Sequence, residues 1–95
     1  MSEENKYIFR VHAIQKMFER KITQEHIKSI IETGEVIRTY VEDKPYPSRL
    51  ILGWIDKRPI HVVVAENTDA QQEIVITAYE PEPKLWESDF KRKKL

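Results

Sequence analysis

Residues 50–65 read LILGWIDKRPIHVVVA, and this stretch decides the fold class. Residues 50–55 place Leu, Leu and Trp on one face and Ile, Gly and Ile on the other, which is the alternation of a β-strand. Residues 60–65 are apolar except for His61, which is typical of a strand inside a sheet. The short turn predicted between them makes an antiparallel hairpin, and its simplest register places Trp54 opposite His61 on the same sheet face.

The neighbouring segments extend this hairpin into a sheet. Residues 36–41 are rich in β-branched and aromatic side chains and change the period from about 3.6 residues to 2. Residues 73–79 form a last strand, which ends before Pro81 because proline cannot donate to a ladder. Residues 7–9 are a candidate for one further short strand. We therefore expect four main strands joined antiparallel by short connections, beginning near Val36, Leu50, Ile60 and Glu73.

Two amphipathic helices are predicted before these strands. Between Arg10 and Arg20 the apolar residues recur at helical spacing, and they are Val11, Ile14, Met17 and Phe18, with Ala13 at their margin. A second helix should begin at the N-cap Thr23 and end at Gly34 in the left-handed conformation. Its apolar stripe consists of Ile27, Ile30 and Ile31. The expected fold class is therefore α+β, with two N-terminal helices packed on a four-stranded, mainly antiparallel sheet.

The composition fits a single domain over residues 1–95. With 40% hydrophobic and 34% charged side chains, 95 residues are enough for one core and too few for two. We expect an ordered core over about residues 6–90 and a solvated basic tail at residues 91–95. The polar start lacks the apolar stretch of a signal peptide, and no window approaches the ~20 apolar residues of a membrane span. The expected location is cytoplasmic, without a membrane partner.

The motifs indicate neither a metal nor a cofactor. The chain has no cysteine, and His12, His26 and His61 lie too far apart for a metal-ligand spacing. Its two glycines do not make a phosphate-binding loop. Sixteen Lys and Arg balance sixteen Asp and Glu, so the net charge favours neither nucleic acid nor an anionic membrane as a partner.

One group of candidate functional residues lies on the first predicted helix. His12, Lys16 and Arg20 are four residues apart and therefore fall along one side of it. They could hold a polyanion, with the two cations on phosphates and the imidazole exchanging a proton near neutral pH. The alternative is an ordinary solvated helix face with Glu19 interleaved, and the spacing by itself favours this alternative.

Other candidates lie on the strands and their connections. His61, within a run of apolar residues, must either bond a partner in the core or face a cleft, and both interpretations stay open. Tyr79 could supply a phenol beside such a cleft, or it could simply pack at the sheet margin. Arg49 flanks the long loop between the first two main strands, where binding residues are common. Trp86 and Phe90 are expected to pin the tail onto the domain rather than to bind a base.

A family resemblance rests on several short segments spread over residues 8–92. They are Val11-His12-Ala13 with Met17 and Glu19-Arg20, Gly34-Glu35-Val36-Ile37 with Tyr40, Pro47 with Leu50 and Gly53, Pro59-Ile60-His61-Val62-Val63, and Thr77-Ala78-Tyr79 with Pro81 and Trp86. In this order and spacing they resemble the bacterial and archaeal family called domain of unknown function 4258 (DUF4258). That family looks like a relative of the RelE/ParE toxin superfamily, and some members are encoded beside a zinc-finger protein of the type that serves as antitoxin to the MqsR toxin.

The resemblance implies a RelE/ParE-like fold and a metal-independent endoribonuclease of the toxin–antitoxin type. Such an enzyme makes the RNA 2′-hydroxyl attack the neighbouring phosphate, which needs a proton acceptor, a proton donor and positive charge. Residues of the required chemical types are His12, His61 and Tyr79 for catalysis, and Lys16, Arg20 and Arg49 for the phosphate. The implied partners are RNA or the ribosome, and an antitoxin of the zinc-finger type.

The same resemblance leaves a non-catalytic alternative open. Ribonucleases of this superfamily often carry their catalytic residues on the sheet, whereas Lys16 and Arg20 are predicted on a helix. Other members act through a protein partner, and the fold does not decide between the two functions. The alternative is a protein-interaction module that binds its partner through an exposed edge strand or through the Pro-rich aromatic tail.

Overall fold

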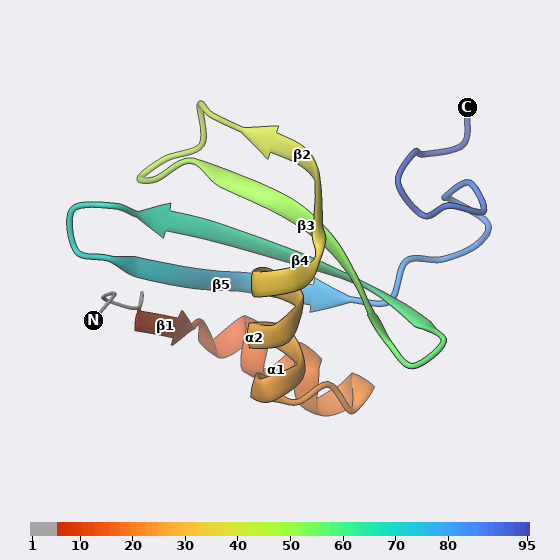
Figure 1. Ribbon diagram of the computed structural model, residues 1–95, viewed down its shortest axis with the longest axis horizontal. Coiled ribbons are helices and arrows are strands. Elements are labelled where there is room, and N and C mark those ends of the chain that lie inside the picture. Colours follow the sequence, from red (N-terminus) through yellow and green to blue (C-terminus); the bar gives the residue numbers. More distant parts are fainter. Residues whose placement is uncertain (1–5) are drawn as a thin grey trace.

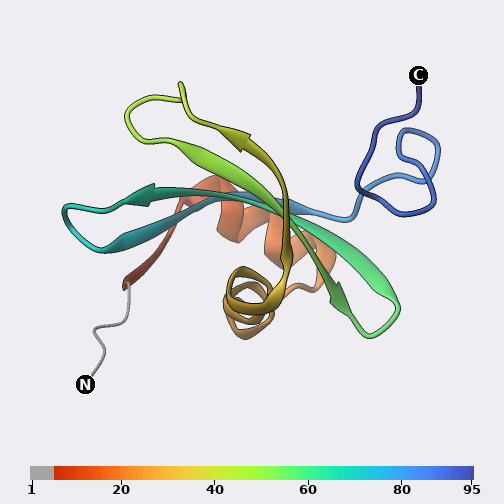
Figure 2. The same ribbon diagram turned by 45° about the horizontal axis from the view of Figure 1, so that its top comes forward.

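A five-stranded sheet carries two helices on one face in residues 6–95, the part of the chain that the computed structural model describes (Figure 1, Figure 2). The elements follow in the order β1 (Lys6–Phe9), α1 (Val11–Arg20), α2 (Gln24–Thr33), β2 (Glu35–Tyr40), β3 (Ser48–Ile55), β4 (Arg58–Asn67) and β5 (Gln72–Tyr79). Within the sheet the strands lie in the order β1-β5-β4-β3-β2. The α+β class, both helices and the four main strands predicted from the sequence are confirmed.

The expectation of a four-stranded sheet is wrong in number, because β1 adds a fifth strand. β1 pairs in parallel with β5, with Tyr7 beside Glu73 and Phe9 beside Val75, whereas the other neighbouring strands are antiparallel. A strand of four residues is too short to show a clear period of its own. The position of β1 in the sheet depends on pairing with β5, which is distant in the chain. In the sequence, β1 was indicated only by the candidate short strand at residues 7–9.

The predicted register of the β3–β4 hairpin is also wrong. His61 lies opposite Leu52, and Trp54 lies opposite Pro59. The connection is tighter than the one predicted, because β4 begins at Arg58 and Asp56 turns the chain with a left-handed φ of 54°. The difference amounts to two residues, so it leaves every side chain on its expected face. Trp54 therefore still shares a sheet face with His61, although it is not its direct neighbour.

The two ends of α2 give one confirmed prediction and one wrong one. Thr23 is the N-cap: its Oγ1 accepts the backbone N–H of His26 at 3.1 Å, and Nδ1 of His26 accepts the N–H of Thr23 at 3.1 Å. Gly34 is not left-handed, since its φ is −75°. Lack of space is what requires glycine there, because a Cβ would stand 2.5 Å from the Ile30 carbonyl oxygen and 2.7 Å from that of Leu52.

α1 buries a different face from the one predicted. Ala13 (0% exposed) and Met17 (4% exposed) lie in the core and face the sheet. The other apolar residues of the predicted stripe are exposed instead: Val11 (72%), Ile14 (45%) and Phe18 (86%). The small side chain of Ala13 lets the helix lie close to β5, and the Arg10 N–H bonds the Val75 carbonyl at 3.1 Å where the helix begins. The close contact with the sheet therefore sets the rotation of α1, and larger apolar side chains are left exposed.

The hydrophobic core fills the space between the helices and the sheet. It consists of Ala13, Met17, Ile22, Ile27, Ile30, Ile51, Ile60, Val62, Val64, Val75 and Ala78. The central strands β3, β4 and β5 supply most of the sheet side, and α1 and α2 lie across them (Figure 2). In residues 6–95, no helix is long and apolar enough to cross a membrane.

Candidate functional site

His61 lies on the sheet face opposite the helices. Its neighbours Ile60 and Val62 belong to the helix-side core, and side chains alternate along a strand, so His61 points to the other side. The C-terminal segment, residues 80–95, runs past the end of β5 and folds back beside this face (Figure 1). Trp86 is 5% exposed, and His61 is 0% exposed. The imidazole is therefore sealed between the sheet and the C-terminal segment.

Both nitrogens of the His61 ring are engaged in hydrogen bonds. Nε2 lies 2.7 Å from the Phe90 carbonyl oxygen, and Nδ1 lies 3.2 Å from the hydroxyl of Tyr79. A carbonyl can only accept, so Nε2 carries the hydrogen, and in the neutral ring Nδ1 accepts from the Tyr79 O–H. The ring also packs edge-on against Trp86, with centroids 4.5 Å apart. This arrangement leaves neither ring nitrogen available to a substrate.

The segment that supplies the Phe90 carbonyl has an unusual backbone conformation. Phe90 has a φ of 58°, which is uncommon for a residue other than glycine. Its ring meets Trp54 edge-on at a centroid distance of 6.1 Å, and its N–H bonds the Glu87 carbonyl at 2.8 Å. These contacts hold the turn so that its carbonyl points at His61. The predicted role of Trp86 and Phe90, to pin the tail onto the domain, is confirmed.

The environment keeps His61 and Tyr79 in their neutral forms. Burial lowers the pKa of the His61 imidazole, and the hydrogen bond to the Phe90 carbonyl offsets part of that change. Burial raises the pKa of the Tyr79 phenol, nearby Tyr40 raises it further, and Arg38 lowers it. A neutral acceptor nitrogen facing a neutral hydroxyl is the pair that the geometry requires.

We expect the free energy of unfolding to decrease as the pH falls below about 6.5. In the unfolded chain the His61 imidazole takes up a proton near that pH, whereas in the folded protein it stays neutral to a lower pH. Its contribution is therefore complete above the ordinary pKa and is lost as the pH falls from there to the folded value. Urea unfolding over a pH series measures this dependence, as the slope of the free energy of unfolding against pH.

His61→Gln should remove that part of the pH dependence. The matched control is His12→Gln, which removes an exposed imidazole without touching the C-terminal segment and should keep the parent slope. A His61→Gln protein with the full parent slope would contradict the role given to the buried imidazole.

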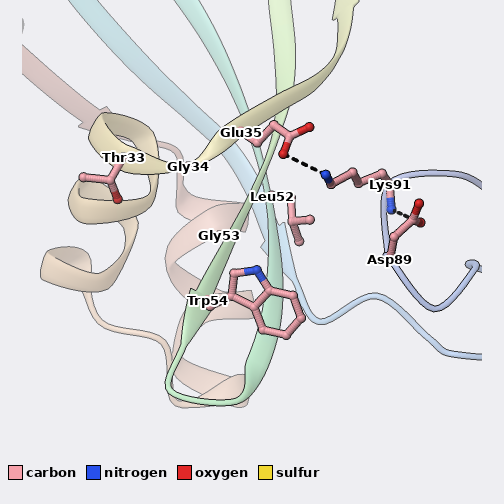
Figure 3. A pocket seen from close by; sticks show the side chains of 8 residues that line it. All are labelled: Thr33, Gly34, Glu35, Leu52, Gly53, Trp54, Asp89 and Lys91. Atoms are coloured by element: carbon pink, nitrogen blue, oxygen red, sulfur yellow. Dashed lines mark hydrogen bonds and ion pairs between the residues drawn. The ribbon is translucent and has the colours of Figure 1, made fainter.

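An open pocket of about 580 Å³ lies beside the sealed histidine, between the end of α2, strand β3 and the C-terminal segment (Figure 3). It is lined by Thr33, Gly34, Glu35, Leu52, Gly53, Trp54, Asp89 and Lys91. Lys91 Nζ lies 2.9 Å from Glu35 Oε1, and Asp89 Oδ1 accepts the backbone N–H of Lys91 at 2.9 Å. Lys91 and Glu35 thus pair with each other, and Asp89 forms its ion pair with Arg92 at 3.4 Å. None of the six candidate residues lines the pocket.

The three candidates on α1 lie on the other side of the sheet. His12 is exposed, and Lys16 Nζ stands 3.6 Å from Glu19 Oε2 one turn further along the helix. The backbone carbonyl of Arg20 accepts a hydrogen bond from Arg58 Nη2 at 2.9 Å. Because α1 packs on the face formed by Val62 and Val75, the whole sheet separates these side chains from His61 and Tyr79.

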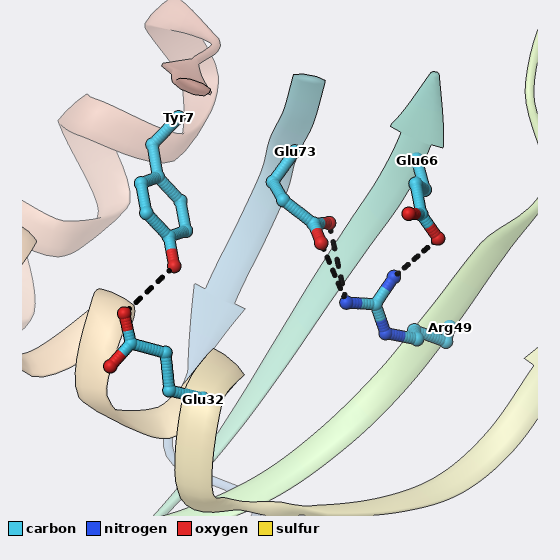
Figure 4. A network of polar contacts seen from close by, with 5 residues as sticks. All are labelled: Tyr7, Glu32, Arg49, Glu66 and Glu73. Atoms are coloured by element: carbon cyan, nitrogen blue, oxygen red, sulfur yellow. Dashed lines mark hydrogen bonds and ion pairs between the residues drawn. The ribbon is translucent and has the colours of Figure 1, made fainter. Parts of the chain in front are cut away.

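Arg49 belongs to a network of ion pairs on the helix side of the sheet (Figure 4). Its Nη2 lies 3.1 and 3.2 Å from the two carboxylate oxygens of Glu73, and its Nη1 lies 3.8 Å from Glu66 Oε1. The three residues come from β3, β4 and β5, so the network ties three strands together. Nearby, the Tyr7 hydroxyl meets Glu32 Oε1 at 3.2 Å. In this arrangement Arg49 has two carboxylate partners of its own.

Of the six candidate residues, the structure brings only His61 and Tyr79 together. The roles given to all six stay predictions. The sequence did not reveal the Phe90 carbonyl as the partner of His61, since a main-chain acceptor has no signature in the sequence. Nor did it reveal that Arg58 bonds both the Arg20 carbonyl and, at 3.0 Å, Glu80. Across residues 6–95, no three His, Asp or Glu side chains are grouped so as to hold a metal ion.

Comparison with known proteins gives one match. Residues 9–80 match the model of a family described as "Domain of unknown function (DUF4258)". The match covers the helices and strands β2 to β5 and stops at the start of the C-terminal segment. No curated protein and no solved structure matches the chain.

Proposed function

Because the chain belongs to the DUF4258 family, whose description names no activity, we propose a function from its geometry alone: a non-catalytic module that binds another protein. The observation that carries the proposal is the exposure of Val11 and Phe18, at 72% and 86%, on a helix that buries only Ala13 and Met17 against the sheet. Large apolar side chains left exposed side by side are typical of surfaces that bind partners. The sealed state of His61 supports the same proposal, since a catalytic imidazole needs access to its substrate.

The surface involved differs from those expected for an interaction module. The C-terminal segment is engaged within the fold through Trp86 and the His61–Phe90 bond, so it offers few groups to a partner. β2 is an edge strand of six residues, but the register of its pairing shifts between Val36 and Arg38. A bulge of this kind interrupts a continuous edge and disfavours the addition of another strand. α1 is therefore the favoured surface.

A photoreactive amino acid at position 18 is expected to cross-link the protein to one discrete partner in its own cells. Position 18 is the most exposed apolar position of α1, at 86%, so a bound partner is within reach of the probe. The matched control is position 85, since Leu85 is also exposed, at 55%, but lies on the C-terminal segment. Gel separation and mass spectrometry of the product measure the outcome. Equal and diffuse labelling from both positions would contradict the proposal.

A second candidate function is RNA cleavage of the RelE/ParE type, and the His61–Tyr79 contact favours it. Here His61 and Tyr79 would exchange protons with the RNA 2′-hydroxyl and leaving group after the C-terminal segment moves away. His12, Lys16, Arg20 and Arg49 would lie outside this site, so the phosphate charge would need other cations. Purified protein, incubated with RNA and with ribosomes, tests it. RNA fragments that end in cyclic phosphate and disappear with His61→Gln would establish this function in place of the first.

The RelE/ParE resemblance also bears on the identity of the partner. A protein of the zinc-finger antitoxin type is the partner that this resemblance implies, and under the first proposal it would bind α1. Identification of the cross-linked product decides this point as well.

A further inference from the structure

The exposed side of α1 carries a continuous apolar stripe, formed by Val11, Ile14 and Phe18. These residues are spaced by three and four positions, so their side chains lie one above the other along the helix. All three are exposed, at 72%, 45% and 86%. Residues at such spacing are the anchors by which a helix binds an apolar surface of another protein. The stripe is thus a surface of the right form for helix-to-helix or helix-to-groove contact.

The stripe lies in a strongly cationic part of a neutral chain. Residues 10–21 contain four cations and one carboxylate, a net charge of +3, whereas the whole chain has a net charge of zero. The carboxylate, Glu19, is already paired with Lys16 at 3.6 Å. Arg10 and Lys21, at the two ends of α1, are exposed and have no ion pair among residues 6–95. Arg10 is the N-cap of α1 and Lys21 is its C-cap, so one cation stands at each end of the stripe.

We infer that this face binds an acidic amphipathic helix of another protein, with apolar side chains over the stripe and carboxylates against Arg10 and Lys21. The inference rests on the proposed function and adds the chemistry of the partner. Opposite charge at the margin of an apolar contact fixes orientation and speeds association. An acidic partner would also supply carboxylates to these two cations, which have no ion pair among residues 6–95.

Charge argues against a second copy of this chain as the occupant. Two copies of α1 that pair antiparallel about a two-fold axis bring the N-terminal end of each helix beside the C-terminal end of the other. Arg10 of one copy would then lie near Lys21 of the other. Like charges placed against each other oppose such a pairing.

Two synthetic helical peptides of equal length test the inference by fluorescence anisotropy. Both carry leucines at the spacing of the stripe, and one is flanked by glutamates while the other has glutamines in their place. The full-length protein is expected to bind the acidic peptide at least about tenfold more tightly than the neutral one. Phe18→Ser should weaken binding by about tenfold or more, and R10Q with K21Q should remove most of the difference between the peptides. Leu85→Ser is the matched control and should bind as the parent does, and circular dichroism checks that each variant is folded.

Several outcomes would overturn the inference. These are equal affinity for the two peptides, no binding of the acidic peptide, or binding that Phe18→Ser leaves unchanged. Sedimentation that shows a dimer of the parent protein and a monomer of Phe18→Ser would make a second copy the occupant. If the protein floats with vesicles that contain anionic lipid, and Phe18→Ser does not, the occupant of this face would be a membrane. If neither peptide binds but position 18 still cross-links one protein in cells, the inferred chemistry of the partner is wrong and the proposed function stands. If neither peptide binds and no discrete protein is cross-linked, the proposed function is wrong too.

Discussion

Gly34→Ala should lower the free energy of unfolding by about 3 kcal/mol, the upper end of the usual cost of overpacking a core. The φ of −75° suits alanine as well as glycine, so the whole effect comes from space. The added Cβ would stand 2.5 Å from the Ile30 carbonyl oxygen, 2.7 Å from the Leu52 carbonyl oxygen and 2.7 Å from Ile51 Cγ2. Two of these neighbours are backbone atoms that take part in α2 and β3, so they cannot turn away. α2 would have to separate from β3.

Urea unfolding, followed by circular dichroism, measures this change. The cost should exceed the roughly 0.4–1 kcal/mol by which alanine stabilises a protein through the unfolded chain. Ser29→Ala is the matched control, because Ser29 is exposed on the same helix, and its effect should stay within about 0.5 kcal/mol. A Gly34→Ala protein as stable as the parent would show that α2 and β3 are not in close contact at this point.

Trp86→Ala should release the C-terminal segment from the sheet. Removing a buried tryptophan side chain costs about 3–5 kcal/mol. The segment has few other attachments to the sheet, chiefly the Phe90 carbonyl on His61, the Phe90 ring against Trp54 and the ion pair from Lys91 to Glu35. These are too weak to replace the lost packing, because an exposed ion pair contributes little. We therefore expect local detachment rather than unfolding of the whole protein.

Hydrogen exchange and the titration of His61 measure the release. The backbone N–H groups of Glu87, Phe90 and Lys94 bond carbonyls within the segment and should lose their protection. The pKa of His61 should rise towards its ordinary value, because the burial that lowers it is lost. Leu85→Ala, at a half-exposed position in the same segment, should leave both readouts unchanged. If the N–H groups of the segment stay protected and the pKa of His61 does not change, Trp86 is not what holds the segment on the sheet.

The candidate site could be predicted only in part, because the sequence lacks the contacts that decide it. The sequence showed that His61 needs a partner or a cleft, and the predicted hairpin placed it on the same sheet face as Trp54. Its partners Tyr79 and Phe90 are 18 and 29 residues away, and one of them acts through a main-chain carbonyl. His12, Lys16 and Arg20 belong to α1 as their spacing predicted, but the sheet lies between them and His61. Helical spacing places side chains around an axis and does not tell which side faces the core.

The sequence by itself determined the class of the fold, both helices, the N-cap at Thr23 and the four main strands. Each depends on local periodicity or on a hydrogen bond within one turn, as between Thr23 and His26, so neighbouring residues suffice to specify it. Only the tertiary structure decided that β1 joins β5, that Ala13 rather than Phe18 faces the sheet, and that the C-terminal segment seals His61. These features depend on close packing and on pairs of groups distant in the chain, which are specified only when the whole core is assembled.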